Sequence, residues 1–552
     1  MLSGYEKLAT IQSPTEHTKR RSKATLPETV DVAIIGAGPG GLTAGAYLAR
    51  TGLRVAVLDA HYVAGGCATM FARGVGEQRY NFDIGLHYIG DCGEDGMIPA
   101  LLNGVGVGLT YETMDSDGFD EIVLPNMRFR IPADRELYEQ RLLETFPKES
   151  TGIKTYCRLL REVEHMASLM GANPSKLKLL SEVVLHGRLV ARNRNATIGQ
   201  FLDKHIKNPD LKAVILGQSG DYGVRPSRAS ALLHCGLSNH YFKGAFYPRG
   251  GGQIIADELA SVIEENGGAV LLRKPVREIL VENGVAVGVR VETSRKTFAN
   301  IRAKTVISNA DLKQTLLELL PDQVLSDEQK TQADNYEMAA AIFITCVGVR
   351  GDMRELGMGT TNYWQFDSND FEGLFDRMER GDLTPTCAYI TSASLKDPHT
   401  AGHAPDGITS LEIMTILSGN PEHWGVAKDP KSSLSYRKNE DYLAKKALVE
   451  KQLLERLEKL FPGTSSRIEL VESATPVTHT RYTWAASGSG YGIAATPEQF
   501  MDRRPGYRGP VPGLYLCGAS TRAGHGIVGA MMSGYQAAKR AAREHNVELP
   551  KL

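Results

Sequence analysis

The chain has 552 residues, of which 42% are hydrophobic, and its 63 basic and 64 acidic residues leave a formal net charge of -1. This charge balance argues against a nucleic-acid partner, because phosphate binding relies on an excess of clustered Lys and Arg. The length is sufficient for a large core and for two or more layered units. The longest apolar run, residues 338–349, is too short for a bilayer span of roughly 20 residues and predicts a buried strand.

The N-terminal residues 1–29 are predicted to form a flexible arm. They lack the positive-then-apolar pattern of a secretory signal, so we expect a cytoplasmic protein. The basic stretch 17–23 predicts a solvated surface, and its alternative is a weak anchor on anionic lipid, which keeps peripheral membrane contact open. Seven dispersed cysteines without a Cys-x-x-Cys pair predict reduced thiols and no metal site.

The first ordered unit is a βαβ arrangement. An apolar strand covers Val32–Ile35, a glycine-rich turn covers 36–41, and a helical pattern covers Leu42–Arg50. A second strand, Arg54–Leu58, ends at Asp59. The glycine motif therefore stands in the strand–helix–strand context that dinucleotide binding requires.

Each residue type in this motif has a physical purpose. Gly36 allows the tight turn, Gly38 lets the backbone approach a pyrophosphate, and Gly41 lets helix and strand pack closely. The helix N-terminus presents free N–H groups and a partial positive charge to the phosphates. Asp59 is placed to accept hydrogen bonds from a ribose. No second motif of this spacing follows a strand, which favours one tightly held dinucleotide.

A second segment continues the cofactor domain. Residues 253–266 have the apolar spacing of a helix, and strands are expected at 270–272, 276–281 and 286–291. Asn283-Gly284, between the last two strands, is a strong hairpin signal.

Near the C-terminus, Leu514–Cys517 reads as a strand, 518–526 as a turn and 529–543 as a helix. A helix N-terminus near Ile527 would present N–H groups and a positive dipole end to an anion.

The remaining residues carry less regular patterns. Helices are expected at 154–170 and 442–460, and strands at 339–349 and 409–416. No nucleophile elbow, zinc-protease motif or phosphate loop of the Gly-Lys-Ser/Thr type appears. The difficult chemistry must then come from a cofactor, which the protein positions and tunes.

Four segments carry a resemblance to a known family: Gly65-Gly66, FDIGLHY at 82–88, the stretch 239–259 and the glycine-rich segment 513–538. The chain resembles the FAD-dependent family of phytoene desaturases, carotenoid isomerases and retinol saturases, from about residue 30 to residue 543. The stretch 239–259 is most similar to the retinol saturase branch.

The resemblance implies an α/β fold with a Rossmann-type FAD-binding domain assembled from residues 30–100, 241–310 and 475–545. An α+β substrate or lid domain, residues 101–240 and 311–474, would cover a long apolar tunnel. The family's acidic residue after Gly518 is replaced here by Ala519-Ser520, so the sugar-chain contact of that acid is lost or taken over by Ser520.

The cofactor-binding residues indicated by the motifs and the resemblance are Gly36, Gly38, Pro39, Gly40, Gly41, Asp59, Ala60, Gly65, Gly66, Cys67, Gly85, Leu86, His87, Val276, Gly518, Ala519, Gly526, Ile527 and Val528. Around 81–90 we expect Phe82 to pack inside, Asp83 to bind the backbone of a neighbouring loop and Gly85 to let the main chain approach the flavin.

Adding hydride to an isolated carbon–carbon double bond needs an acid that protonates the neighbouring carbon. The candidates are His87, Tyr88, His240, Tyr241 and His525. His87 and His525 belong to the two glycine loops and are favoured for flavin contact, and Tyr88 and Tyr241 for proton donation.

The leading interpretation is an FAD-dependent oxidoreductase that saturates a double bond of an apolar isoprenoid or polyene substrate. Desaturation and redox-neutral isomerisation are the alternatives within the class, and NAD(P)H or another donor or acceptor would exchange the electrons. A prenyl-binding chaperone of the GDP-dissociation-inhibitor type is an alternative from a different class, disfavoured because the glycine motif and Asp59 are intact. An amine oxidase with the same cofactor domain is a further, weaker alternative.

Overall fold

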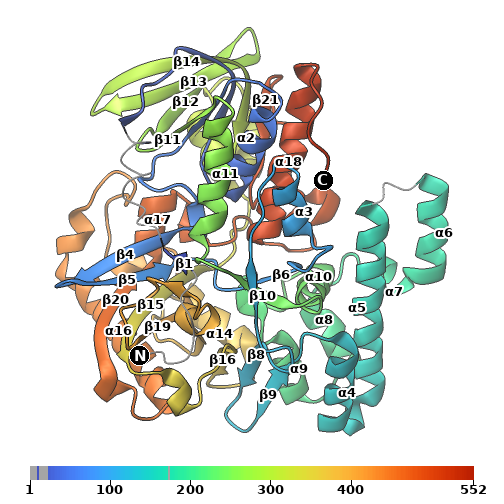
Figure 1. Cartoon of the computed structure of the whole chain (residues 1–552). Coiled ribbons are helices and arrows are strands. Elements are labelled where there is room, and N and C mark those ends of the chain that lie inside the picture. Colours follow the sequence, from blue (N-terminus) through green and yellow to red (C-terminus); the bar gives the residue numbers. More distant parts are fainter. Residues whose placement is uncertain (1–8, 12–20, 22, 172–174) are drawn as a thin grey trace.

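The structure is a computed structural model, and it describes residues 9–11, 21, 23–171 and 175–552. Two seven-stranded sheets organise these residues, and helices pack on and between them (Figure 1).

The first sheet is built from three separated parts of the chain. Its strand order is β11-β3-β2-β14-β13-β12, with β21 paired to β14. β2 lies parallel to both β3 and β14, and β11 and β21 extend this parallel core. The bounds are β2 Thr29–Ile35, β3 Val55–Leu58, β11 Ala269–Leu271, β12 Val276–Glu282, β13 Val285–Ser294, β14 Thr297–Ser308 and β21 Leu514–Leu516.

The parallel strands carry buried apolar residues without alternation, as strands covered on both faces do. Helices α2 (Pro39–Ala49), α11 (Gln253–Glu265) and α18 (Gly526–Glu544) share one apolar core with them. The Rossmann-type arrangement predicted from the sequence is therefore confirmed.

The predicted hairpin is also present. Asn283 and Gly284 connect β12 to β13 with φ values of 51° and 76°. Positive φ at both central residues is the type I′ geometry that Asn-Gly favours.

The second sheet has the order β20-β15-β19-β17-β16-β8-β9. The predicted strands at 339–349 and 409–416 correspond to β15 and β19, which pair antiparallel at its centre. Helix α16 (Glu440–Leu460) packs on this sheet through Val449, Leu453 and Leu457. The bounds are β8 Asp120–Val123, β9 Arg128–Ile131, β15 Ala341–Arg350, β16 Asn362–Phe366, β17 Cys387–Thr391, β19 Ile408–Leu417 and β20 Ile468–Ala474.

A group of helices lies on the side of β8 and β9, and α6 is farthest from these strands, against α5 and α7 (Figure 1). Its members are α4 Arg135–Thr145, α5 Ser150–Gly171, α6 Lys176–His186, α7 Arg188–Arg192, α8 Ile198–His205, α9 Pro209–Leu216 and α10 Ala231–Tyr241. The smaller elements are β4 Met70–Val75, β5 Gln78–Asp83, β6 Ile89–Gly90, α3 Met97–Asn103, β7 Tyr111–Thr113, β10 Ala245–Pro248, α12 Leu312–Gln314, α13 Asp327–Asp334, α14 Phe371–Glu379, α15 Ala393–Lys396, β18 Thr400–Ala401 and α17 Pro476–Thr483.

The described parts of the N-terminal 29 residues are held in the fold. Strand β1 (Ala9–Thr10) pairs with β18, and Thr29 begins β2. Arg21 is 2% exposed, and its Nε donates to Glu264 Oε1 at 2.9 Å. The expectation of a flexible arm does not apply to these residues, because strand pairing and a buried ion pair fix them. Residues 17–20 and 22 of the basic stretch lie outside the described residues.

In the described part of the chain, no helix combines the length and apolarity needed to cross a membrane.

Candidate active site

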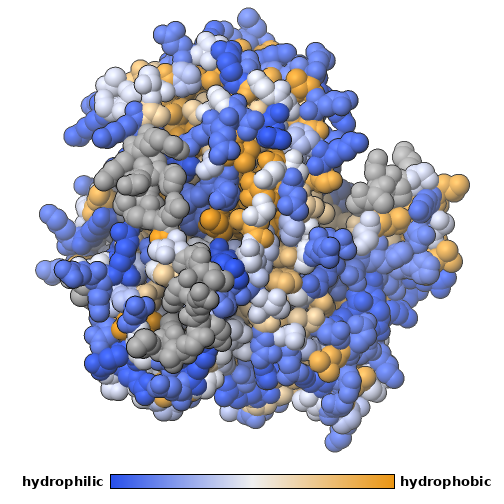
Figure 2. Space-filling model, viewed as in Figure 1, coloured by the Kyte–Doolittle hydropathy of each residue, from blue (hydrophilic) through white to orange (hydrophobic). Residues whose placement is uncertain are grey.

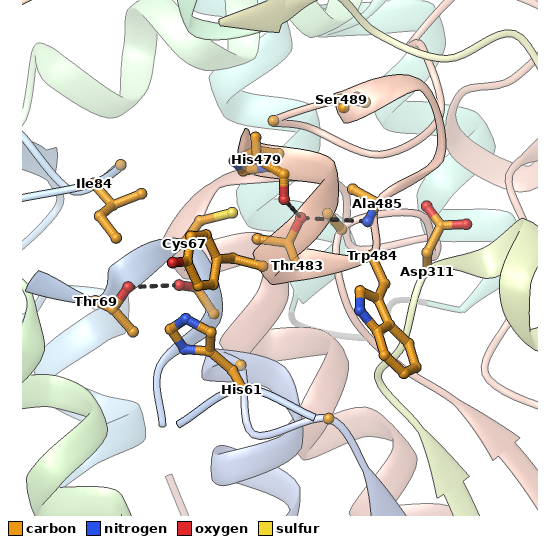
Figure 3. Close-up of a pocket in the computed structure, with 18 of the residues that line it drawn as sticks. His61, Cys67, Thr69, Ile84, Asp311, His479, Thr483, Trp484, Ala485 and Ser489 are labelled. Atoms are coloured by element: carbon orange, nitrogen blue, oxygen red, sulfur yellow. Dashed lines mark hydrogen bonds between the residues drawn. The ribbon is translucent and has the colours of Figure 1, made fainter. Parts of the chain in front are cut away.

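A cavity of about 690 Å³ lies between the two sheets. Its lining comes from β2 and β3 on one side and from β15 and β20 on the other, together with the glycine loops at 36–39, 66–67, 488–492 and 517–521. Figure 3 shows Cys67 and Ile84 facing the segment from His479 to Ala485 across this space. The three parts of the first sheet and one edge of the second therefore meet at a single cavity.

The first glycine turn has the geometry that the motif predicts. Gly36 has φ +95°, which favours glycine. A Cβ added to Gly41 would lie 2.0 Å from Gly36 O, so the helix can follow the strand this closely only with glycine there. Helix α2 begins after Gly38, and no side chain caps it. Its free N–H groups are therefore available to an anion in the cavity.

Asp59 lies at the cavity wall and holds the glycine turn. Its Oδ2 accepts from Ala37 N at 2.7 Å, and its Oδ1 accepts from His61 N at 2.7 Å. Each carboxylate oxygen keeps lone-pair capacity beyond these two bonds. The ribose contact predicted for Asp59 is thus compatible with a structural role that the sequence did not indicate.

The C-terminal segment is locked onto the first. A Cβ on Gly534 of α18 would lie 2.0 Å from Gly40 O of α2. Gly518 N donates to Ser533 Oγ at 2.7 Å, which fixes the glycine loop that precedes α18. α18 begins at Gly526 with no side-chain cap, and it presents a second uncapped helix N-terminus near the cavity.

Asn309 was missed by the sequence analysis. It follows β14 directly, and its side chain lies among three glycines. A Cβ added to Gly38 would lie 2.9 Å from Asn309 Nδ2. A Cβ added to Gly40 would lie 2.6 Å from Asn309 Oδ1, and one added to Gly518 would lie 2.9 Å from it. Its position at the carboxyl end of a parallel strand, beside the strand that carries the glycine turn, is the signal that could have identified it.

Most predicted cofactor residues line the cavity, namely Gly36, Gly38, Pro39, Asp59, Ala60, Gly66, Cys67, Gly85, Val276, Gly518, Ala519, Gly526 and Ile527. Gly40, Gly41, Gly65, Leu86, His87 and Val528 are not among the lining residues. Gly40 and Gly41 serve close packing instead, and Leu86 is 1% exposed in the core behind the wall.

His87 is buried, and neither ring nitrogen has a hydrogen-bond partner among the described residues. Burial lowers the pKa of its imidazole to about 3, so the ring is neutral near pH 7. Its carbonyl oxygen accepts from Lys396 Nζ at 2.7 Å. A neutral imidazole of this kind is a weak proton donor, so the residues near His87 are better candidates for the proton donor.

Tyr88 and Tyr241 are brought together as parallel rings with centroids 4.5 Å apart and an interplanar angle of 5°. Burial raises the pKa of both phenols well above its usual range, so both keep their protons. The two predicted proton donors therefore form one unit.

His240 has a different role from the predicted one. Its Nε2 accepts from Gly90 N at 2.9 Å, and burial lowers the pKa of the ring to about 4. A ring nitrogen that accepts from a backbone N–H is not free to exchange a proton with a substrate, so His240 fixes the strand after Tyr88.

His525 precedes α18, with its ring 5.4 Å from that of Tyr491, and burial lowers its pKa to about 3.

Three ionisable residues near the tyrosines, Asp120, Asp221 and Lys396, were also missed from the sequence. Tyr88 Oη lies 3.1 Å from Asp120 Oδ2 and 2.6 Å from Asp221 Oδ2. Burial lowers the pKa of Lys396 to about 7. None belongs to a spaced motif, so only the fold reveals that they converge.

The residues present fit FAD: a glycine turn without room for a Cβ, two uncapped helix N-termini and an acid at the end of the second strand lie around one cavity. These features define a dinucleotide-binding flavoprotein.

Comparison with known proteins agrees. The family model for flavin containing amine oxidoreductases matches residues 39–348 and 417–542. The chain belongs to this family. It is 31% identical to an all-trans-retinol 13,14-reductase from Danio rerio, over 89% of this chain and 83% of that protein. It is 28% identical to the chloroplastic prolycopene isomerase 1 of an Oncidium hybrid cultivar, over 94% and 85%.

Among solved structures, an oxidoreductase from Methanosarcina mazei has a TM-score of 0.59 at 17% identity and covers 92% of this chain and 100% of its own. The protein is an FAD-dependent oxidoreductase, as the sequence predicted. These relatives give no support to the chaperone alternative.

Proposed function

We propose that this enzyme saturates a carbon–carbon double bond of an apolar isoprenoid or polyene substrate. The observation that carries the proposal is the single cavity, which joins the glycine-lined cofactor cradle to apolar side chains of the second sheet such as Ile342 and Ile344. The retinol reductase and isomerase names of the relatives support a substrate of this class.

In this proposal, FAD is held at its phosphates by Gly36, Gly38 and α2, at its ribose by Asp59 and near its adenine by Val276. Ala519, Gly526 and Ile527 would lie beside the remaining chain and ring, with His87 and His525 behind them. The bound flavin supplies the two-electron chemistry. Residues 30–100, 241–310 and 475–545 are the proposed cofactor domain, and 101–240 and 311–474 the proposed lid.

The chain's own residues exclude water and provide a proton. The buried rings of Tyr88, Tyr241 and Tyr389 surround the acids Asp120 and Asp221. A double bond without polarising substituents gains most from such a donor, because protonation of one carbon must accompany hydride addition to the other.

The electron donor is proposed to be NAD(P)H or another small or protein donor that binds transiently, since the sequence holds one dinucleotide motif. Prolycopene isomerisation is the second candidate, favoured by the 28% identity over 94% of the chain. Desaturation would use the same cavity with the electron flow reversed.

We also propose peripheral membrane contact through α6. Leu177, Leu180 and Leu185 on this helix are 79%, 62% and 65% exposed. Apolar residues are visible at the right edge of Figure 2, where α6 lies in Figure 1. Lys178 lies between the first two of these leucines and Arg188 begins the next helix, and such basic residues suit an anionic lipid surface.

The test of the function is product analysis. Purified holoenzyme is reduced anaerobically with dithionite and mixed with an all-trans polyene alcohol. Saturation predicts a product heavier by two hydrogens. A product of unchanged mass but altered double-bond geometry would favour isomerisation, and a product lighter by two hydrogens, formed with oxidised enzyme, would favour desaturation.

A further inference from the structure

We propose that Asp221 holds a proton beside the cavity wall, shared with Tyr88, and donates it to the substrate carbon that does not receive hydride. This inference rests on the proposed saturation reaction and adds a proton donor that lies outside the sequence motifs.

Asp120 is the ionised member of the acid pair. Asp120 Oδ2 accepts from Gln218 Nε2 at 2.7 Å and from Trp364 Nε1 at 3.0 Å. Its Oδ1 accepts from Asn362 Nδ2 at 2.8 Å. Three N–H donors converge on a side chain that is 0% exposed. Burial raises the pKa of Asp120, and these hydrogen bonds oppose that rise and favour the carboxylate form.

The orientation of the Asn362 amide is settled by its other contacts. Its Oδ1 accepts from Lys396 Nζ at 2.5 Å and from Thr391 Oγ1 at 2.8 Å. The ammonium form of Lys396 has only donors, so in that form the amide oxygen faces Lys396 and the NH₂ group faces Asp120.

The single hydroxyl proton of Tyr88 decides which of the two acids is protonated. Its hydroxyl lies within hydrogen-bond distance of both Asp120 and Asp221, but a phenol has one proton to donate. If both acids were ionised, one contact would place two oxygens together without a hydrogen between them. Since Asp120 is the carboxylate, Tyr88 donates to Asp120 and Asp221 donates to Tyr88. Asp221 is therefore the protonated acid.

Asp221 lies beside the cavity wall. It is not among the residues that line the cavity, but part of its surface is accessible although protein surrounds it. Two residues further on, a Cβ on Gly223 would lie 3.2 Å from Cδ2 of Tyr491, which lines the cavity. The loop that carries Asp221 thus packs directly behind the cavity wall.

The surroundings also accommodate the charge that donation creates. Saturation adds one electron pair and two hydrogens: the cofactor chemistry supplies the electron pair with one hydrogen, and Asp221 supplies the other as a proton to the second carbon. Asp221 then becomes a carboxylate. The hydroxyl of Tyr241, which also interacts with Asp221, can donate to this carboxylate, while Tyr88 continues to donate to Asp120. Solvent returns the proton between turnovers.

The test begins with the proton itself. Infrared difference spectra between wild-type holoenzyme and the Asp221→Asn variant at pH 7 should show loss of a protonated carboxyl stretching band that shifts in D₂O. Asp406→Asn, at an exposed position, is the control and should leave the band in place. Tyr88→Phe should keep the band but move it, because one hydrogen bond is lost. Absence of the band from the Asp221→Asn difference would overturn the proposal.

The second readout is turnover. Asp221→Asn should retain FAD and lower the saturation rate at least 100-fold, in the range of general-acid contributions, whereas Asp406→Asn should match the wild type. An undiminished rate in Asp221→Asn would equally overturn the proposal. If the wild type saturates no polyene, the proposed function fails, while the infrared band still decides whether Asp221 holds a proton. Should Asp221→Asn fail to fold, the shifted band in Tyr88→Phe decides the same question.

Discussion

Tyr88 Oη and Asp221 Oδ2 are 2.6 Å apart, although the residues are separated by 133 positions in the chain. Tyr88 follows the glycine-rich segment around Gly85, which lines the cavity. Asp221 ends a short 3-10 helix, Ser219–Asp221, which follows α9. Their contact joins the segment after Gly85, which lines the cavity, to the loop after α9.

The saturation rate should depend on the protonation of Asp221. Burial, followed by the charge of Asp120, raises the pKa of Asp221 from 3.8 to about 8. The rate should be level below pH 8 and fall about tenfold per unit above it, because the carboxylate has no proton to give. The groups facing Asp221 are Asp120, Tyr88, Tyr241, Tyr389 and Tyr491. Rate measurements across pH 6–10 test this, and a rate that rises through pH 8 would contradict it.

The same shift predicts a pH dependence of stability. Because the folded pKa lies above the unfolded value, the folded state binds more protons between about pH 4 and pH 8, and the free energy of unfolding falls as pH rises through this window. The Asp221→Asn variant should lose this component. Urea unfolding at pH 5 and pH 8 should show a smaller pH effect in the variant than in the wild type. An equal pH effect on the stability of the variant and of the wild type would show that a group other than Asp221 causes it.

Gly85→Val should weaken FAD retention at least tenfold. A Cβ at residue 85 would lie 2.9 Å from Cys67 O, so the wall of the cavity must shift. Gly93→Val is the control, since nothing lies within 4 Å of a Cβ there. FAD content per protein after gel filtration measures the effect. Equal content in both variants would show that the main chain at Gly85 does not approach the cofactor.

Asn309→Ala should reduce both stability and FAD affinity. The side chain fills the space between Gly38, Gly40 and Gly518, and its Nδ2 donates to Gly36 O at 3.4 Å. Loss of a hydrogen bond of this part-buried kind costs about 1 kcal/mol. Asn300→Ala, at an exposed position of β14, should change stability by less than about 0.5 kcal/mol. Thermal unfolding of apo- and holoprotein separates the two effects, and similar behaviour of both variants would refute this role of Asn309.

Replacing Leu177, Leu180 and Leu185 by Ser should reduce sedimentation with anionic vesicles. Each side chain is more than half exposed, so the folded state loses little packing. Turnover of detergent-solubilised substrate should be unchanged, because α6 lies away from the cavity. Leu434→Ser, also at an exposed leucine, is the matched control. Undiminished vesicle binding of the triple variant would exclude α6 as the contact.

The sequence predicted the parts of the site that depend on local spacing. The turn from Gly36 to Gly41, the Asn283-Gly284 hairpin and α18 each follow from backbone requirements that few residues meet. The acid pair could not be predicted, because Asp120 and Asp221 carry no local signal and acquire their roles only when β8 and the loop after α9 meet Tyr88. His240 shows the converse: it stands beside Tyr241 in the chain, yet its nitrogen serves Gly90.

The measurement that tests the central claim most directly is the visible spectrum of anaerobic, dithionite-reduced holoenzyme after addition of an all-trans polyene alcohol. A saturase predicts that the oxidised flavin spectrum returns as substrate is consumed, with one flavin reoxidised for each double bond lost. A spectrum that stays reduced while the substrate is unchanged or merely isomerised would contradict the account.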